Sequence, residues 1–281
     1  SAWFGCSSLT SFPLIDTGSA VTLRYAWTGC SSLTSFPLID TSLVTEMSYA
    51  WSGCSSLTSF PLIDTSSATS LTYAWGNCTG LTSFPLLDTS AATTMYNAFR
   101  GCSSLTAFPS IDTSNVWTFH GAWGSCNNLV NFPWINTSKA TSLREAWWWC
   151  DSMETFPAID TSLCTNFFYT WRQTYALTTF PWIDLSKAAL LERTWADSGI
   201  VNFPPNMFDN TDVTDYSTAF SSSWALSSES KDNIIISIAA AVTRNAALIN
   251  GTLVLQSAPI RTAASDAAVA TLTAAGWTLT I

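Results

Sequence analysis

The chain has 281 residues, of which 47% are hydrophobic and 10% are charged, and its formal net charge is −9. Only ten residues are basic. This argues against a nucleic-acid-binding protein, which needs clustered lysine and arginine. The sequence contains no run of about 18 apolar residues, so it predicts no membrane insertion, and no signal peptide is visible.

A repeat of 24 residues runs from the start of the chain to about residue 220. The cysteines and prolines keep this interval without a slip: Cys6, Cys30, Cys54, Cys78, Cys102, Cys126, Cys150, and Pro13, Pro37, Pro61, Pro85, Pro109, Pro133, Pro157, Pro181. A fixed period in the twenties indicates a solenoid, in which each unit buries its apolar face against its neighbours.

Each unit begins with a short extended segment, for example residues 57–64. Leu57, Phe60 and Ile63 are its apolar positions. A short run with aromatic and β-branched members, closed by proline and aspartate, predicts a strand or an extended bend. Since proline removes a ladder donor, we expect the strand to end near Pro61.

A short helix is predicted next, over residues 65–77. The apolar positions Ala68, Leu71, Ala74, Trp75 and Cys78 follow a helical spacing. Glycine or asparagine precedes the cysteine in five units, where a left-handed C-cap belongs: Gly5, Gly29, Gly53, Asn77, Gly101. The many serines and threonines favour 3₁₀ turns in some units. The stripe also places a ladder of aromatic residues in the core: Trp3, Trp27, Trp51, Trp75, Phe99, Trp123, Trp147, Trp171, Trp195, Phe220.

The repeat also resembles a known family. Its pattern Ala-Trp-x-Gly-Cys-Ser-Ser-Leu-Thr-Ser-Phe-Pro-x-Ile-Asp-Thr-Ser is similar to the BspA-type bacterial surface protein repeat, a divergent leucine-rich repeat. Similar repeats occur in phage tail-associated proteins. The resemblance covers roughly residues 1–220, with tryptophan where that family often has Met-Phe before Gly-Cys. It implies a curved or twisted α/β solenoid with a surface-binding role, and it supplies no catalytic residues.

The repeat decays towards its C-terminal end, and the composition changes after residue 220. Thr174 and Ser198 take the place of the ladder cysteine. Beyond residue 220 we expect a helix over 230–247, a strand over 251–255, a helix over 265–275 and a strand over 277–281. The predicted fold class is therefore an α/β solenoid of strand-plus-short-helix repeats. Residues 1–220 form about nine units, the first incomplete, and residues 221–281 form a C-terminal α/β cap that covers the end of the core.

The cysteines are expected to be buried thiols. In-register units stack equivalent side chains about 4.8 Å apart and point them the same way, so the seven ladder cysteines cannot all form pairs. Small buried thiols explain such a row best. Cys164 lies off this ladder and is expected to be one more core residue.

A second ladder consists of aspartates, with one asparagine: Asp16, Asp40, Asp64, Asp88, Asp112, Asn136, Asp160, Asp184. Calcium or backbone N–H groups could offset the repulsion between neighbouring carboxylates. Asn136 keeps the acceptor oxygen without the charge, which favours an Asx-turn or helix N-cap over a metal site. We therefore predict neither a metal nor a cofactor.

The sequence gives little support for catalysis. His120 is the only histidine, and it lies at a position held elsewhere by Thr72, Tyr96 and Arg144. We interpret it as a surface residue. One unladdered histidine does not make a catalytic set, so the prediction is a protein that is not an enzyme.

Two surface features could bind a partner. An outward threonine row resembles ice-binding surfaces: Thr10, Thr34, Thr58, Thr82, Thr106. Aromatic residues also replace polar or aliphatic ones in the fifth to eighth units, and we predict ligand contact there: Trp117, Trp134, Trp148, Trp149, Phe168, Trp182. An exposed apolar patch often marks an interaction site.

These patterns predict a non-enzymatic adhesive or structural module that is extracellular, at a cell surface or on a virion. Its expected partner is a glycan, a cell-surface protein or a copy of itself. The alternative function is ice binding. Because the chain opens inside a unit, we expect either an upstream segment that covers the first unit or head-to-tail association into a filament through exposed edges. The edge residues are Trp3, Cys6, Trp277, Leu279 and Ile281.

Overall fold

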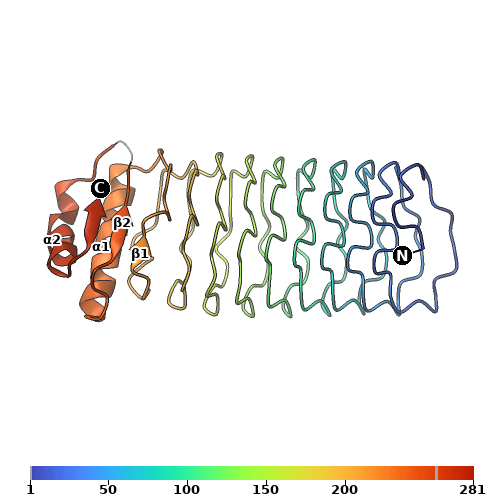
Figure 1. Ribbon diagram of the computed structural model, residues 1–281, viewed down its shortest axis with the longest axis horizontal. Helices are drawn as coiled ribbons and strands as arrows, with labels where there is room; N and C mark the ends of the chain where they lie inside the picture. Colours follow the sequence, from blue (N-terminus) through green and yellow to red (C-terminus); the bar gives the residue numbers. More distant parts are fainter. Residues whose placement is uncertain (1, 257–258) are drawn as a thin grey trace.

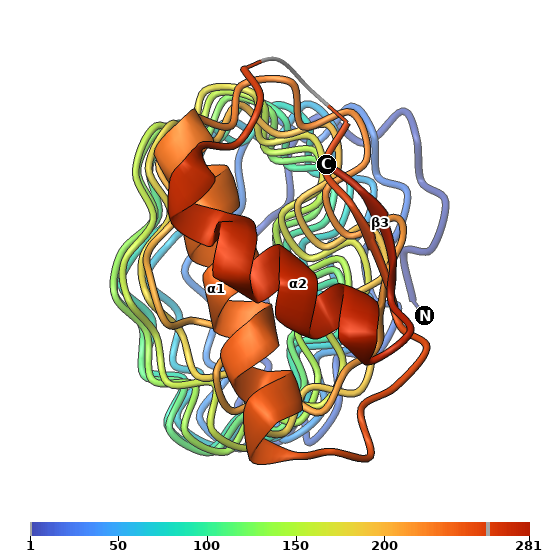
Figure 2. The same cartoon turned by 90° about the vertical axis from the view of Figure 1, so that its left-hand side faces the viewer.

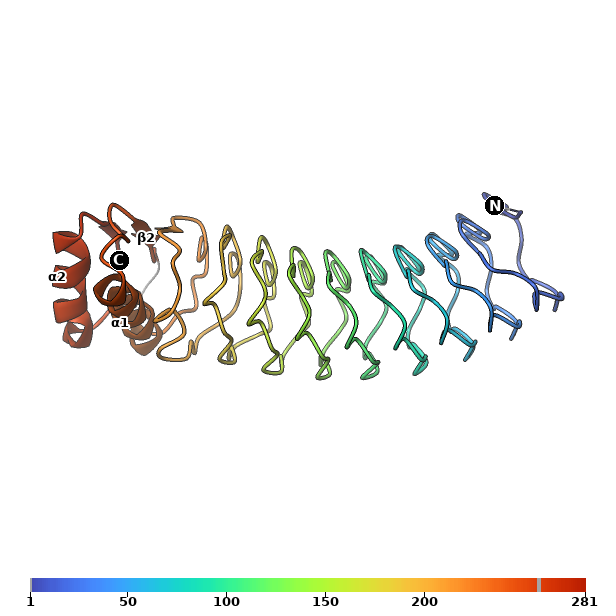
Figure 3. The same ribbon diagram turned by 90° about the horizontal axis from the view of Figure 1, so that it is seen from below.

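In the computed structural model, which describes residues 2–256 and 259–281, the chain forms an elongated, gently curved stack of coils (Figure 1; Figure 3). Successive coils follow one another along the long axis. The N-terminal coil and the C-terminal helices therefore lie at opposite ends. The repeat arrangement predicted from the 24-residue period is present.

Neighbouring coils are stacked in register. Parallel bridges join residues that are 24 positions apart, from Thr22↔Glu46 through each coil to Asn166↔Leu190. Alternate backbone N–H groups also donate to the next coil: that of Tyr25 to the carbonyl of Ser48 at 3.1 Å and that of Trp27 to the carbonyl of Ala50 at 2.8 Å. The stack thus holds its backbone together mainly between coils.

The short helix predicted for each unit is wrong. No helix occurs among residues 2–227. Within residues 65–77 the chain turns at 66–67 and at 72–77, on either side of the bridge residue Ser70. Hydrogen bonds from the N–H of one residue to the carbonyl three positions earlier close these turns. Examples are the Ala74 N–H to the Leu71 carbonyl at 3.0 Å and the Cys78 N–H to the Trp75 carbonyl at 3.2 Å. Inward side chains at three- and four-residue intervals therefore arise here without an α-helix.

Left-handed residues keep these turns from continuing as a helix. The glycines before the cysteine do have positive φ, with 75° at both Gly29 and Gly53. A second left-handed position, four residues earlier, is occupied by Tyr25, Tyr49 and Tyr73 at φ 53–59°. Tyrosine rarely adopts this conformation, so a tyrosine at this position in the sequence does not indicate that a helix is interrupted there.

The core is a continuous set of stacked rings, as predicted for the aromatic ladder. Neighbouring ladder rings, from Trp3 to Phe220, lie 5.2–6.2 Å apart between centroids and are nearly parallel. Each also meets a phenylalanine edge-to-face, for example Trp51 and Phe60 at 4.8 Å. Such geometry adds about 0.5–1.5 kcal/mol per pair beyond burial. Trp3, on the first coil, is only half-buried.

The C-terminal residues form a small α/β unit. Its elements are β1 (Asp215–Tyr216), α1 (Ser228–Arg244), β2 (Thr252–Val254), a 3₁₀ helix (Ala263–Ser265), α2 (Asp266–Ala274) and β3 (Thr278–Thr280). The three strands are parallel in the order β1-β2-β3. Figure 2 shows α1 and α2 lying across the end of the stack. Within the described residues, no helix is long and apolar enough to cross a membrane.

Side-chain hydrogen bonds hold α1 in this unit. Its N-cap, Ser227, accepts a hydrogen bond from the backbone of Ser230 at 3.2 Å. The buried carboxylate of Asp232 accepts hydrogen bonds from the Thr262 backbone at 3.1 Å and from the Ser265 hydroxyl at 2.6 Å. A buried carboxylate needs such donors, and here they connect α1 to the start of α2.

We expect Trp75→Ala to lower the free energy of unfolding by roughly 3–5 kcal/mol, because it opens a cavity in the ring stack. Trp75→Phe should cost less, since Phe99 fills the same place in the next coil. The exposed Trp117→Ala is the control and should stay within about 0.5 kcal/mol of wild type. Urea unfolding followed by near-ultraviolet circular dichroism measures all three. Equal midpoints for Trp75→Ala and Trp117→Ala would contradict the ring stack as the source of stability.

Candidate functional site

The corner row is the most exposed apolar feature of the stack. We define it as the position after the repeated proline: Leu14, Leu38, Leu62, Leu86, Ser110, Trp134, Ala158, Trp182. Its six large members are 49–73% exposed. In three coils the next residue donates its N–H to the proline carbonyl, for example Ile63 to Pro61 at 2.9 Å, with equivalent bonds at Leu87 and Ile111. In these three coils the tight turn places the corner residue at its apex, directed outward.

Beside the corner row runs the aspartate row, in which every member forms an Asx-turn. One carboxylate or amide oxygen accepts the backbone N–H of the residue two positions later, at 2.8–3.0 Å in all eight coils. The prediction of backbone capping is confirmed in its Asx-turn form, and Asn136 makes the same bond as its neighbours.

In two coils these hydrogen bonds also favour the ionised carboxylate. The backbone N–H and the hydroxyl of Ser42 lower the pKa of Asp40, and the hydroxyl and N–H of Ser90 lower that of Asp88. In the described part of the chain, no group of three or more histidine, cysteine, aspartate or glutamate side chains could hold a metal ion.

Two exposed threonine rows follow the stack. One is the predicted row from Thr10 to Thr106, and the other includes Thr45, Thr69 and Thr93. In both rows hydroxyl groups donate to a carbonyl of the preceding coil, for example Thr34 to Thr10 at 3.2 Å and Thr69 to Thr45 at 3.1 Å. The bonded hydroxyls are thus held in a similar orientation, at Thr34, Thr82 and Thr106 in the first row and at Thr45, Thr69 and Thr93 in the second.

The six aromatic residues predicted to contact a ligand do not share one row. Trp134 and Trp182 belong to the corner row, whereas Trp117 interrupts the second threonine row. All three are exposed, and within the described residues none has an aromatic neighbour. Trp149 is exposed and lies against Trp148, with centroids 5.6 Å apart. The predicted patch is therefore divided.

Trp148 and Phe168 are only half-buried and take part in local packing, which corrects their interpretation as outward contacts. The Trp148 indole N–H donates to Gln173 at 3.0 Å, and the Arg100 guanidinium lies 5.0 Å from its ring centroid. Arg144 lies 4.4 Å from the Phe168 centroid. These cation–π contacts occupy the ring faces from within the chain.

Glu145 lies at the centre of this cluster. Its carboxylate is 2.8 Å from Arg100 and 3.1 Å from Arg144. Burial acts to raise its pKa, but the hydrogen bonds and charges of the two arginines outweigh burial and lower it. A cavity of about 140 Å³ lies here, lined by Arg100, Glu145, Trp148 and Tyr169. The Glu145 carboxylate is thus shared between two arginines of the chain itself.

His120 joins the same cluster, and its side chain is half-buried, with 23% of its surface exposed. Its ring lies 4.6 Å from that of Tyr96, and Nε2 is 4.0 Å from Glu145. Burial lowers the pKa of His120, although Glu145 opposes the shift.

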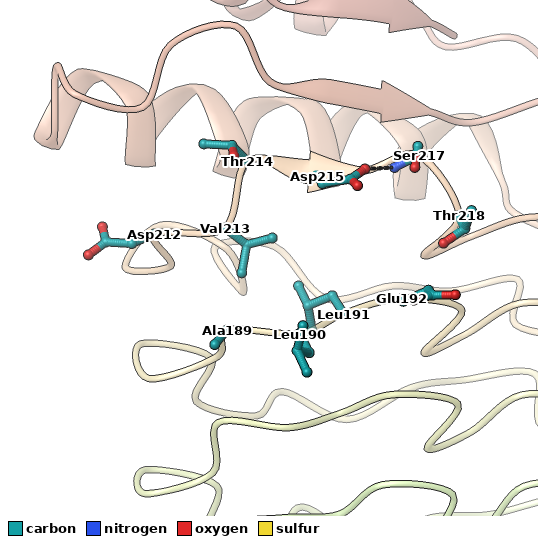
Figure 4. Close-up of a pocket in the computed structure, with 10 residues that line it drawn as sticks. All are labelled: Ala189, Leu190, Leu191, Glu192, Asp212, Val213, Thr214, Asp215, Ser217 and Thr218. Atoms are coloured by element: carbon teal, nitrogen blue, oxygen red, sulfur yellow. Dashed lines mark hydrogen bonds between the residues drawn. The ribbon is translucent and has the colours of Figure 1, made fainter.

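A larger cavity, of about 390 Å³, opens between the eighth coil and β1 (Figure 4). Residues 189–192 line one side and residues 212–218 the other. The Asp215 carboxylate faces its own loop and accepts the Ser217 N–H at 2.9 Å. The Asp212 carboxylate pairs with Arg244 at 2.7 Å. Both aspartates are thus engaged by groups of the chain itself, and Glu192 is the third carboxylate that lines the cavity.

The predicted self-association residues differ in exposure. On the first coil Cys6 is exposed and Trp3 half-buried, and at the other end Leu279 and Ile281 are half-buried. Trp277 is buried and donates its indole N–H to the Leu248 carbonyl at 2.9 Å, so it is not available as a contact surface. β3 pairs only with β2 in the described sheet.

The cysteine ladder is buried, except at Cys6, and its members are free thiols, as is the buried Cys164. From Cys30 to Cys150 each thiol donates to a carbonyl of the preceding coil at 3.2–3.3 Å. Burial, with a smaller contribution from the neighbouring Cys30, raises the pKa of Cys54 to about 12.

Comparisons with known proteins give little guidance. No family model matches the chain, and no curated protein matches it. A leucine-rich cell surface protein from Faecalibacterium prausnitzii has a similar solved structure, at 16% sequence identity and a TM-score of 0.26. The match covers 69% of this chain and 65% of that protein. The likeness is too weak to assign a fold or a function.

We expect thiol reagents to modify Cys6 in the native protein and all eight cysteines after denaturation without reductant. The thiolate is the reactive form, and burial with a raised pKa suppresses it in the ladder. Thiol titration before and after adding guanidinium measures both values. Fewer than six titratable thiols in the denatured, unreduced protein would show disulfides among the eight cysteines.

Proposed function

We propose that this chain is a non-enzymatic surface module whose stacked coils present ordered rows for adhesion. The carrying observation is the corner row, where six large apolar side chains are exposed along a stack whose core is otherwise closed. Exposed apolar patches mark interaction sites in soluble proteins. A leucine in every coil from Leu14 to Leu86 is unfavourable in water, so a partner that covers the row accounts for it.

The architecture suits this role. Residues 1–220 form a leucine-rich-repeat-like solenoid in this proposal, and residues 221–281 form its cap. The coils are linked by hydrogen bonds and by the ring stack, so outward residues vary without loss of the core. The proposed location is the cell exterior or a virion surface, and the proposed partners are a glycan, a surface protein or other copies of the chain.

Self-assembly is a further part of the proposal. The first coil exposes Phe4 and Cys6, and β3 has one unpaired edge in the described sheet. In this proposal the C-terminal end of another copy contacts these exposed residues. Such a head-to-tail contact is heterologous and builds a ring or a filament. Sedimentation and electron microscopy test it, since a strictly monomeric native protein at all concentrations excludes such an assembly.

Ice binding is the second candidate function. The hydroxyls of Thr34, Thr82 and Thr106 are held by carbonyls of the preceding coil at 3.2–3.4 Å, which gives a regular row of fixed orientation. Thermal hysteresis of the purified protein tests this function directly, and its absence removes the candidate.

We expect the triple variant Leu38→Ser, Leu62→Ser, Leu86→Ser to bind its target surface roughly tenfold more weakly or worse, because burial of one leucine contributes about 1.5–3 kcal/mol. Arrays of glycans and of surface proteins, probed with the full chain, identify the target. The control variant Thr45→Ser, Thr69→Ser, Thr93→Ser changes a different exposed row and should bind normally. Binding that survives in the leucine variant, or no binding to any surface, would contradict the proposed role.

A further inference from the structure

The C-terminal half of the corner row has a composition of its own. Its first four members are leucines, but the next four read Ser110, Trp134, Ala158 and Trp182. The two tryptophans are 58% and 49% exposed. In the coil that precedes each of them, the corner position holds a small residue, Ser110 or Ala158. The rings therefore stand in alternate coils, with open space between them.

This spacing suits one kind of polymer. Coils stack at about the distance of neighbouring strands, so the two rings lie roughly 10 Å apart along the axis. In an extended β-1,4-linked hexose chain, one sugar is about as long as one coil is high, and successive sugars are turned over. Only every second sugar then presents the same face to a protein, which matches one tryptophan in every second coil. The apolar faces of sugar rings pack well on aromatic rings.

The neighbouring aspartate row adds charge to this surface. Asp112, Asp160 and Asp184 lie two residues after Ser110, Ala158 and Trp182, respectively. Each uses one carboxylate oxygen, Oδ1, for its Asx-turn. The other oxygen, Oδ2, accepts no hydrogen bond within the described residues. The nearby Lys139 is directed to Asn115, at 2.6 Å. Lys187 lies three residues after Asp184, at the repeat position that Lys139 holds two coils earlier. The surface is thus an apolar row beside three aspartates and two lysines, and the Oδ2 atoms of the aspartates are the groups that can meet the positive charges of a sugar chain.

A second copy of this chain fits the surface poorly. Consider two copies whose corner rows face each other and whose stacks run in opposite directions. The twofold axis that relates them lies across the stacks, so the aspartate row of one copy faces the aspartate row of the other. With parallel axes, each tryptophan would meet the same tryptophan of the other copy, and each small residue would meet its equivalent. Like charges or mismatched volumes result in both arrangements.

We propose that the corner row from Ser110 to Trp182, with Asp112, Asp160 and Asp184, binds an extended β-linked polymer of amino sugars. Trp134 and Trp182 stack on alternate sugars, and the carboxylates pair with protonated amino groups. The inference rests on the proposed adhesive function and names its ligand class.

The test uses the full chain and soluble chitosan, below neutral pH, where the polymer amino groups are protonated. We expect Trp134→Ala/Trp182→Ala to weaken binding at least tenfold. Trp117→Ala is the matched control, because that side chain is 54% exposed but lies in another row. It should bind like wild type.

A second variant separates charge from stacking. Asp160→Asn/Asp184→Asn keeps the acceptor for each Asx-turn, as the natural Asn136 shows with its bond to Ser138 at 3.0 Å. It should fold normally, bind chitosan several-fold more weakly and lose part of the salt dependence of binding. Acetylated chitin oligomers and cellulose oligomers, which lack the charge, should bind wild type more weakly than chitosan oligomers of equal length.

The outcomes are distinguishable. Chitosan binding that is unchanged in the tryptophan variant overturns the site, and equal affinity for neutral and cationic polymers overturns the charged ligand. Self-association that the tryptophan variant abolishes assigns the row to a second copy instead. Binding to other surfaces without binding to chitosan overturns this inference but leaves the adhesive function intact, whereas binding to no surface overturns both.

Discussion

In-register stacking of identical positions is the constraint on which the rest of the structure depends. A coil of 24 residues places ring over ring and thiol over thiol, and backbone N–H groups reach the carbonyls of the next coil. An insertion or deletion of one residue within a coil would shift all the following residues out of register with the ladders. This explains why the repeat holds its period over seven cysteines while its outward residues change freely.

The turns make this stacking compatible with a narrow coil. Each coil directs four residues of one short segment into the core, for example Leu71, Ala74, Trp75 and Cys78. This requires sharp bends of the backbone, and the residues with left-handed conformation provide them. Gly29 and Gly53 meet this need at no steric cost, whereas Tyr25 and Tyr49 adopt the same conformation at some cost. The tyrosine rings stack on one another 4.8 Å apart, and this contact favours the strained backbone.

The sequence predicted the features that depend on the repeat period and on burial. It did not predict the local backbone conformation, because different conformations produce the same spacing of apolar residues. The 24-residue interval predicted the stacked coils, the inward rings and the buried thiols, and Asn136 identified the Asx-turns. The stripe through Leu71, Trp75 and Cys78 predicted a helix, because consecutive turns produce similar spacing. The sequence predicted an outward direction at the corner position only through Trp134 and Trp182. It did not single out the leucines as a surface, since Leu62 lies between Pro61 and Ile63 in an apolar run. In its coil the tight turn closed by the Ile63 N–H directs Leu62 outward.

The same periodicity limits what such a surface recognises. Every row repeats at the height of one coil, so a partner that contacts several coils in the same way must repeat at that interval or at a multiple of it. Identical leucines give such a partner affinity but no fixed position, because each shift by one coil restores the contacts. Substitutions such as Trp134 and Trp182 remove this degeneracy, since a ligand that stacks on both is held at one place along the stack. Drift of the repeat in its C-terminal half therefore creates a defined site on a uniform scaffold, and the invariant core allows that drift at little cost in stability.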